Sequence, residues 1–268
     1  EKKEVIKADE EPYTVFTPYS RKWMEKLNGD NTYLNCWNSA EYFHNFLEIK
    51  DIRRFQLSDL GFIETGNVFR PFRLNDNELH SYEKTRDYPA LDSTSRVSVH
   101  LRFGTVSVRE LVSKALTINH TWLNELIWRE FFMQILWHFP YVVDKPFKTK
   151  YQFIKWIDSA TDFERWCRGE TGFPMVDAGI RELNETGFMH NRVRMITASF
   201  LVKHLLINWQ LGEAYMAKKL MDFELSSNNG NWQGAAGSGC DSAPYFRIFN
   251  PMSQAEKFDS KSIYIKKW

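Results

Sequence analysis

The chain has 268 residues, of which 43% are hydrophobic, and its 35 Lys and Arg nearly balance its 34 Asp and Glu to leave a net charge of +1. That length and apolar content suffice for one large core, and the charge balance excludes a wholly basic nucleic-acid coat, although not a local basic face. Three scattered cysteines, the lack of an apolar run near the roughly 20 residues of a membrane span, and an N-terminus unlike a signal peptide favour a reducing, cytoplasmic setting.

The N-terminal third contains few clear elements. Residues 1–20 are polar and contain proline, with one short β-prone run at 13–16 that predicts a strand end or a linker. Residues 38–60 predict two short helices. Residues 70–95 are charged and have little apolar periodicity, so they predict a long connection that is either functional or disordered.

Helices dominate from about residue 96 onward. Ser107 and Glu110 have the spacing of a capping box that opens a helix through Leu116. Further helices are predicted at 121–139, at 176–186 with Gly187 as its C-cap, at 191–211 as the longest, and at 213–225. Strands are almost absent, so the fold class is mainly α.

The helix predicted at 121–139 carries an unusual face. Trp122, Glu125 and Arg129 share one side of it, with Trp128 beside them. A solvated Glu–Arg pair is one interpretation. A pocket wall, where the carboxylate accepts hydrogen bonds from a base or a sugar, is the other, and the two tryptophans favour it.

Asn191, Arg194 and Met195 begin a helix that then becomes strongly apolar. A buried arginine needs a partner, and Asp222 is the candidate. His190, just before them, is expected to be a capping histidine.

Two loops add polar groups suited to a ligand. Residues 94–98 supply three hydroxyls and a cation ahead of a helix, which fits a pyrophosphate or an ordinary helix cap. Residues 228–251 are rich in amides, glycines and aromatics, which indicates a binding loop. No nucleophilic triad, zinc motif or P-loop is present, so any chemistry must come from a cofactor.

Four segments (122–130, 172–178, 189–195 and 228–251) resemble the photolyase/cryptochrome flavoproteins, closest to the class I cyclobutane pyrimidine dimer photolyases. The resemblance implies a multi-helical FAD-binding domain without the family's N-terminal α/β antenna domain. Residues 1–20 would be the exit strand and linker from that missing domain, and 21–268 the helical catalytic domain, truncated at its C-terminal end.

The resemblance also implies light-driven repair, in which an electron passes from excited, reduced FAD to a flipped-out pyrimidine dimer. The partner would be UV-damaged DNA, with no membrane, and the protein a monomer. The antenna chromophore is not specified. A cryptochrome-type photoreceptor without repair activity is the alternative, and a helical scaffold without flavin is a third hypothesis.

Residue roles carried over from the family fall into three sets. FAD would be held by Tyr82, Thr94, Ser95, Arg96, Val97, Ser98, Trp122, Arg129, Asn191, Arg194, Asp222, Glu224 and Asn228. Catalysis and electron transfer would involve Glu125, Asn228, Trp232, Trp209 and Trp156. DNA would be contacted by Arg86, Glu125, Trp128, Asn191, Arg192, Met195, Arg247 and Lys257. The chain departs from the family pattern at Gly234, where a tryptophan is usual, at Glu224 for an aspartate, and at Phe188 for a tryptophan.

Overall fold

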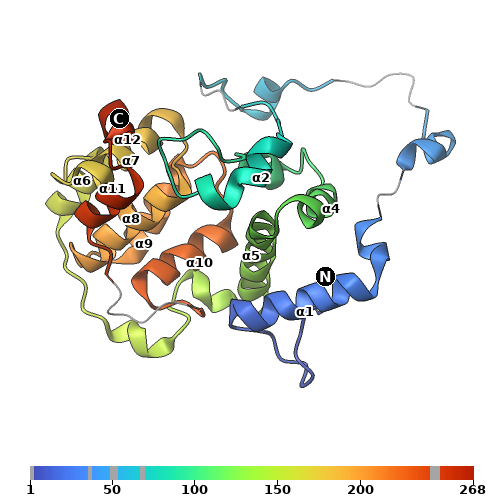
Figure 1. The fold of residues 1–268 in the computed structure, drawn as a ribbon, viewed down its shortest axis with the longest axis horizontal. Coiled ribbons are helices and arrows are strands. Elements are labelled where there is room, and N and C mark those ends of the chain that lie inside the picture. The colour runs from blue at the N-terminus through green and yellow to red at the C-terminus, as the bar shows by residue number, and fades with distance from the viewer. Residues whose placement is uncertain (1–2, 36–37, 49–53, 67–69, 242–247) are drawn as a thin grey trace.

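The computed structural model describes residues 3–35, 38–48, 54–66, 70–241 and 248–268, and the fold is mainly helical (Figure 1). The α-helices are α1 (Phe16–Gly29), α2 (Asp76–Thr85), α3 (Ser98–Phe103), α4 (Val108–Ile118), α5 (His120–His138), α6 (Ala160–Arg168), α7 (Pro174–Thr186), α8 (Asn191–Lys203), α9 (Trp209–Lys219), α10 (Leu225–Ala236), α11 (Pro251–Phe258) and α12 (Ile263–Lys267). Short 3-10 helices are η1 (Asn31–Leu34), η2 (Ser39–Asn45), η3 (Leu57–Leu60), η4 (Pro140–Val143) and η5 (Thr149–Phe153).

Helix α10 lies at the centre of the fold and packs against α5, α8 and α9. One core joins the C-terminal helices and contains Trp166, Leu201 and Trp232, while a second core around α1, α4 and α5 contains Tyr19 and Phe131. The seam between the two cores therefore runs along α5, α8 and α10.

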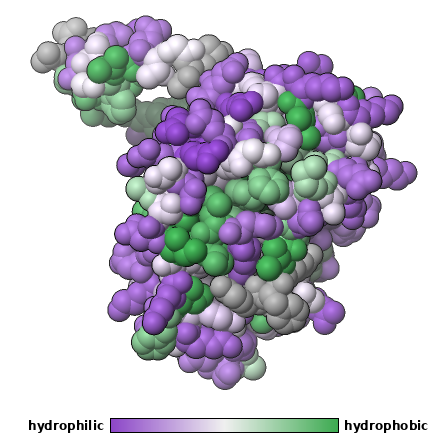
Figure 2. All heavy atoms as spheres, turned by 90° about the vertical axis from the view of Figure 1, so that its left-hand side faces the viewer, coloured by the Kyte–Doolittle hydropathy of each residue, from purple (hydrophilic) through white to green (hydrophobic). Residues whose placement is uncertain are grey.

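Residues 39–48 and 54–66 extend away from the helical body (Figure 1), and Leu47 and Ile63 are 83% and 88% exposed. The face in Figure 2 is largely hydrophilic, with hydrophobic side chains gathered near its middle. None of the helices in the described ranges is both long enough and apolar enough to cross a membrane.

Several expected elements are confirmed. Helix α5 ends just before Pro140, and α7 ends at Gly187, which adopts the left-handed conformation (φ 67°). The two short helices expected within 38–60 are η2 and η3.

Of the two alternatives for residues 13–16, the strand end is wrong, while residues 13–15 have no regular secondary structure. Phe16 begins α1, and among the described residues the only β-type pairing is an isolated bridge between Ile6 and Pro12. Residues 70–95 are also not one long connection, because α2 occupies 76–85 and Asn75 caps it by accepting a hydrogen bond from Asn77 N. The cap and one buried side chain, Leu79, suffice for this helix despite its weak apolar periodicity.

The predicted helix at 191–211 is two helices. Helix α8 ends at Lys203, Leu206 takes a left-handed conformation (φ 53°), and the Asn208 side chain caps α9 by accepting from Gln210 N. The helix predicted at 213–225 is confirmed only over 213–219, since α9 ends at Lys219 and α10 begins at Leu225. The capping box also fails, because Ser107 makes no side-chain hydrogen bond at the start of α4.

Candidate functional site

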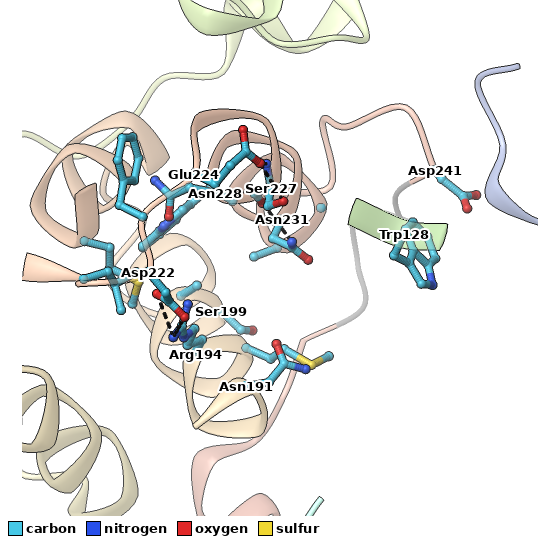
Figure 3. A pocket seen from close by; sticks show the side chains of 18 of the residues that line it. Trp128, Asn191, Arg194, Ser199, Asp222, Glu224, Ser227, Asn228, Asn231 and Asp241 are labelled. Atoms are coloured by element: carbon cyan, nitrogen blue, oxygen red, sulfur yellow. Dashed lines mark hydrogen bonds and ion pairs between the residues drawn. The ribbon is translucent and has the colours of Figure 1, made fainter. Parts of the chain in front are cut away.

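A cavity of about 460 Å³ opens on the seam between the two cores (Figure 3). Helix α8 forms one wall and α10 another, with Trp128 of α5 across from them. The lining residues are Trp128, Asn191, Arg194, Met195, Ala198, Ser199, Met216, Leu220, Asp222, Phe223, Glu224, Ser227, Asn228, Asn231, Trp232, Gly234, Ala235, Asp241 and Phe249. The lining contains both amide and hydroxyl groups and apolar side chains, as suits a flat ligand with polar edges.

The expected ion pair between Arg194 and Asp222 is confirmed. Arg194 donates to both Asp222 carboxylate oxygens (3.2 and 2.9 Å), and the Ser98 hydroxyl donates to the same group (2.7 Å). Although burial opposes ionisation of Asp222, Arg194 and Ser98 hold its pKa below the usual value. Through Asp222, Ser98 at the start of α3 is linked to Arg194 of α8, and the Asp222 carboxylate is held at the cavity wall.

Glu224 is the N-cap of α10. Its carboxylate accepts from the backbone N–H groups of Ser226 and Ser227 (3.0 and 2.9 Å) and from both hydroxyls. These bonds outweigh the effect of burial and lower the pKa of Glu224. The cap holds the first turn of α10, and so places Asn228 and Trp232 on the cavity.

Asn228 presents its amide to the cavity from α10. Its Nδ2 donates to Glu213 Oε1 (2.8 Å) and to the Glu213 carbonyl (3.2 Å), so its Oδ1 is oriented by these bonds. Glu213 was not anticipated from the sequence, because it lies on α9 and its distance to Asn228 is set by helix packing.

The start of α8 is built around His190. Its Nδ1 accepts from Arg192 N (3.1 Å), and burial with nearby Arg194 lowers its pKa to about 4, so the ring is neutral. The capping role expected of His190 is confirmed.

Three buried nitrogens in this region have no protein partner: Arg96 Nε, His190 Nε2 and Arg192 Nε. Arg96 also holds a left-handed conformation (φ 47°), and its guanidinium lies over the Phe188 ring at 4.3 Å. Both guanidiniums are paired through their other nitrogens, Arg96 with Asp92 and Arg192 with Asp87, and none of the three residues borders the main cavity.

Glu125 does not pair with Arg129 and does not border the cavity. It forms an ion pair with Arg86 of the segment after α2. Burial raises the pKa of Glu125, against the opposing charge of Arg86. The surface Glu–Arg pair considered for this helix is therefore wrong, because Arg86 reaches Glu125 from another part of the chain.

Arg129 borders a second cavity of about 320 Å³ near α1 and α4, and burial lowers its pKa. Trp122 is 2% exposed and its Nε1 donates to Ser95 Oγ (3.3 Å). Of the residues expected at the cofactor, these also do not border the main cavity: Tyr82, Thr94, Ser95, Arg96, Val97 and Ser98.

The tryptophans expected to carry electrons all belong to, or pack on, the C-terminal core. Trp232 and Trp209 are buried (3% and 4% exposed), and the half-buried Trp156 packs against the same core. Trp166 meets Trp232 edge to face at 6.2 Å, a contact that sequence reasoning missed.

The expected basic rim is partly neutralised. Arg192 pairs with Asp87 (2.6 Å) and lies over the Phe258 ring, which Lys257 also approaches (5.2 Å). Arg247 falls outside the described residues. The remaining residues expected to contact DNA, Trp128, Asn191 and Met195, all border the cavity.

Comparison with known proteins identifies the family. The family model described as the FAD binding domain of DNA photolyase matches residues 122–268. Deoxyribodipyrimidine photo-lyase of Escherichia coli is 38% identical over 98% of this chain and 59% of its own length, and that of Neurospora crassa is 44% identical over 72% of this chain and 34% of its own. The chain belongs to the DNA photolyase/cryptochrome family.

Solved structures agree with this assignment. An archaeal photolyase from Sulfolobus tokodaii gives a TM-score of 0.71 at 41% identity, covering 79% of this chain and 49% of that one. A cryptochrome from Synechocystis gives 0.67 at 34% identity, covering 72% and 42%. The present chain spans about three fifths of the length of the Escherichia coli relative.

FAD is the cofactor of this domain, and the residues present fit it. The amides of Asn191, Asn228 and Asn231 suit the polar edges of its ring systems, and Trp232 with its neighbours supplies apolar surface.

Proposed function

We propose that this chain is the catalytic part of an enzyme that repairs cyclobutane pyrimidine dimers in DNA by light. The observation that carries the proposal is the shape of the main cavity. Trp128, Asn191 and Met195 border the same space as Asn228 and Trp232, so a flipped-out pair of linked pyrimidines and a flavin would have adjoining walls.

FAD, when bound, would supply a light-excited electron donor for the dimer. The chain's own residues would bind the lesion and orient it. Trp128 offers a ring on which a flipped-out pyrimidine stacks. Asn191 offers amide donors and acceptors to the pyrimidine edge, and Met195 offers an adaptable apolar surface.

Arg86 and Glu125 are a second pair of residues that we propose to contact the damaged DNA. Their ion pair is only half-buried, so a pyrimidine edge could exchange for one of its partners. Glu125 would then accept a hydrogen bond from the lesion, and Arg86 would be released toward a DNA phosphate. Arg192 and Lys257 add positive charge at the rim.

Trp232, Trp209 and Trp156 would carry electrons from the surface to the cavity, with Trp156 as the exposed end. Substituting Trp156 by Phe would then slow photoreduction of the oxidised flavin while repair by pre-reduced protein continues. We further propose that the helical catalytic unit is a monomer and that it includes the whole of α1 (Phe16–Gly29), because Tyr19 is buried in the second core.

The test is repair of an oligonucleotide containing one thymine dimer, followed by chromatography after blue light under reducing conditions. Asn191→Ala should slow repair about tenfold or more, because it removes the amide at the pyrimidine edge. The exposed Asn77 on α2 does not border the cavity and gives a matched control, so Asn77→Ala should repair like the parent. Persistence of the dimer with the parent protein would exclude the proposal.

A cryptochrome-type photoreceptor is the second candidate, and Gly234 is the observation that favours it. Gly234 borders the cavity, and a Cβ built there meets no atom within 4 Å. The tryptophan side chain that the resemblance leads us to expect at this position is missing. Its absence would weaken binding of a lesion but leave flavin binding intact.

A further inference from the structure

The indole of Trp128 is held in one plane by a ring from α1, Phe16, and by two rings of its own helix, Phe131 and Phe132. Phe16 stacks on it face to face, with ring centroids 3.7 Å apart and an interplanar angle of 4°. Phe131 stands perpendicular to both rings, at 5.5 Å from Trp128 and 5.9 Å from Phe16, so it lies beside the stack. Phe132 tilts against Trp128 by 31° at 5.4 Å.

Phe16 is itself held by Asp241, in the segment after α10. It is the first residue of α1, and its backbone N–H donates to Asp241 Oδ2 (2.9 Å), 225 residues away. Val15, at the N-cap position of α1, supplies no side-chain cap. Asp241 therefore acts as the missing cap, and its negative charge meets the positive end of the α1 dipole.

Asp241 also borders the main cavity, as Trp128 does. Figure 3 places Asp241 beside Trp128, on the side of the cavity opposite Asn191. The contact between α1 and the segment after α10 thus lies directly at the wall where a flipped base would stack.

We propose that Phe16 and Asp241 are positioning residues: they hold the Trp128 ring in the plane that a flipped-out pyrimidine needs, and so set the preference for damaged over undamaged DNA. This inference rests on the proposed function. Phe16 covers one face of the indole, so only the surface that Phe16 and Phe132 leave uncovered is offered to a ligand. A ring fixed beforehand loses less freedom on binding than a ring that must be ordered by the ligand.

A competing role for Phe16 has the opposite consequence. A ring stacked at 3.7 Å would also block a base from that face of Trp128. If the main effect of Phe16 were to block this face, replacing Phe16 would strengthen lesion binding. Positioning predicts weaker lesion binding, so the direction of the change separates the two roles.

The first arm of the test reports on the ring alone. The flavin-loaded chain is labelled with 5-fluorotryptophan, and the Trp128 resonance is assigned with Trp128→Phe. Phe16→Leu should shift or broaden that resonance, while Phe16→Tyr, which keeps the ring, should leave it near its original position. Phe163 stacks on Trp166 at 6.0 Å and does not border the main cavity, so Phe163→Leu is the matched control and should move only other resonances.

The second arm measures dissociation constants in the dark for a duplex with one thymine dimer and for the same duplex undamaged. Phe16→Leu should reduce the preference for the dimer about five- to tenfold, as expected for an aromatic pair. Phe16→Tyr and Phe163→Leu should preserve it. If Phe16→Leu does not fold, Asp241→Ala replaces it, because losing the cap frees the start of α1, and the same losses are expected.

An unchanged Trp128 resonance in Phe16→Leu or in Asp241→Ala overturns the inference, as does an unchanged or increased dimer preference. A parent protein without any dimer preference overturns the proposed function instead. In that case a shifted Trp128 resonance would still support the ring-positioning part.

Discussion

His190 offers a stability prediction that follows from one hydrogen bond. Its Nδ1 must be unprotonated to accept from Arg192 N and cap α8, while Nε2 is buried without a partner. Burial and the charge of Arg194 lower its pKa from 6.5 to about 4. The folded state therefore resists protonation at this site, and the unfolded chain takes up the proton first as pH falls.

The sign and size of the effect follow from linkage. Because the folded pKa is the lower one, stability is full above about pH 6.5 and is lost as pH falls toward 4. Two and a half pKa units correspond to about 3 kcal/mol in total, of which about 2 kcal/mol is lost by pH 5. This loss falls on the turn that places Asn191, Arg192 and Arg194.

The assay is urea unfolding followed by helical circular dichroism at pH 7.5 and pH 5.0. Parent and His190→Asn are compared, since Asn keeps a capping oxygen but does not titrate. Other titrating groups are common to both proteins, so the parent should lose about 2 kcal/mol more than the variant between the two pH values. Equal losses, with equal denaturant slopes, would refute a neutral, low-pKa His190.

Three other substitutions test the site. Asp222→Asn should lower the free energy of unfolding by about 2 kcal/mol and reduce flavin per chain in absorbance spectra, because the half-buried Arg194 loses its counter-charge; retained flavin and stability would contradict this. Gly212→Ala should cost about 1–3 kcal/mol in urea unfolding, because a Cβ there would overlap the indole of Trp232, and an unchanged midpoint would argue against that close approach. Gly234→Trp should tighten dark binding of dimer-containing DNA about five- to a hundredfold, from about 1–3 kcal/mol of stacking, with unfolding unchanged; equal affinity would show that the open wall is not used.

Features coded by neighbouring residues were predictable from the sequence. Gly187 ends α7 because a left-handed C-cap favours glycine, and Pro140 stops α5. The break after α8 was missed because the apolar run continues through it, and the signal that could have found it was Asn208 as an N-cap.

Pairings between distant segments were harder to predict. The Arg194–Asp222 pair was foreseen because a buried cation demands a counter-charge, and these were the charges at hand. The pairing of Glu125 with Arg86 and the stacking of Phe16 on Trp128 depend on how α2 and α1 dock on α5, which no local pattern encodes. Sequence thus indicated which side chains carry chemistry, while helix docking decided which of them meet.

The most direct test of the central claim is the light dependence of dimer loss. Purified, flavin-loaded protein is mixed with DNA containing a single thymine dimer under reducing conditions, and the remaining dimer is measured after blue light and after equal time in the dark. The account predicts loss of the dimer in the light only. A dimer that persists in the light, with flavin bound and the DNA in complex, would contradict it.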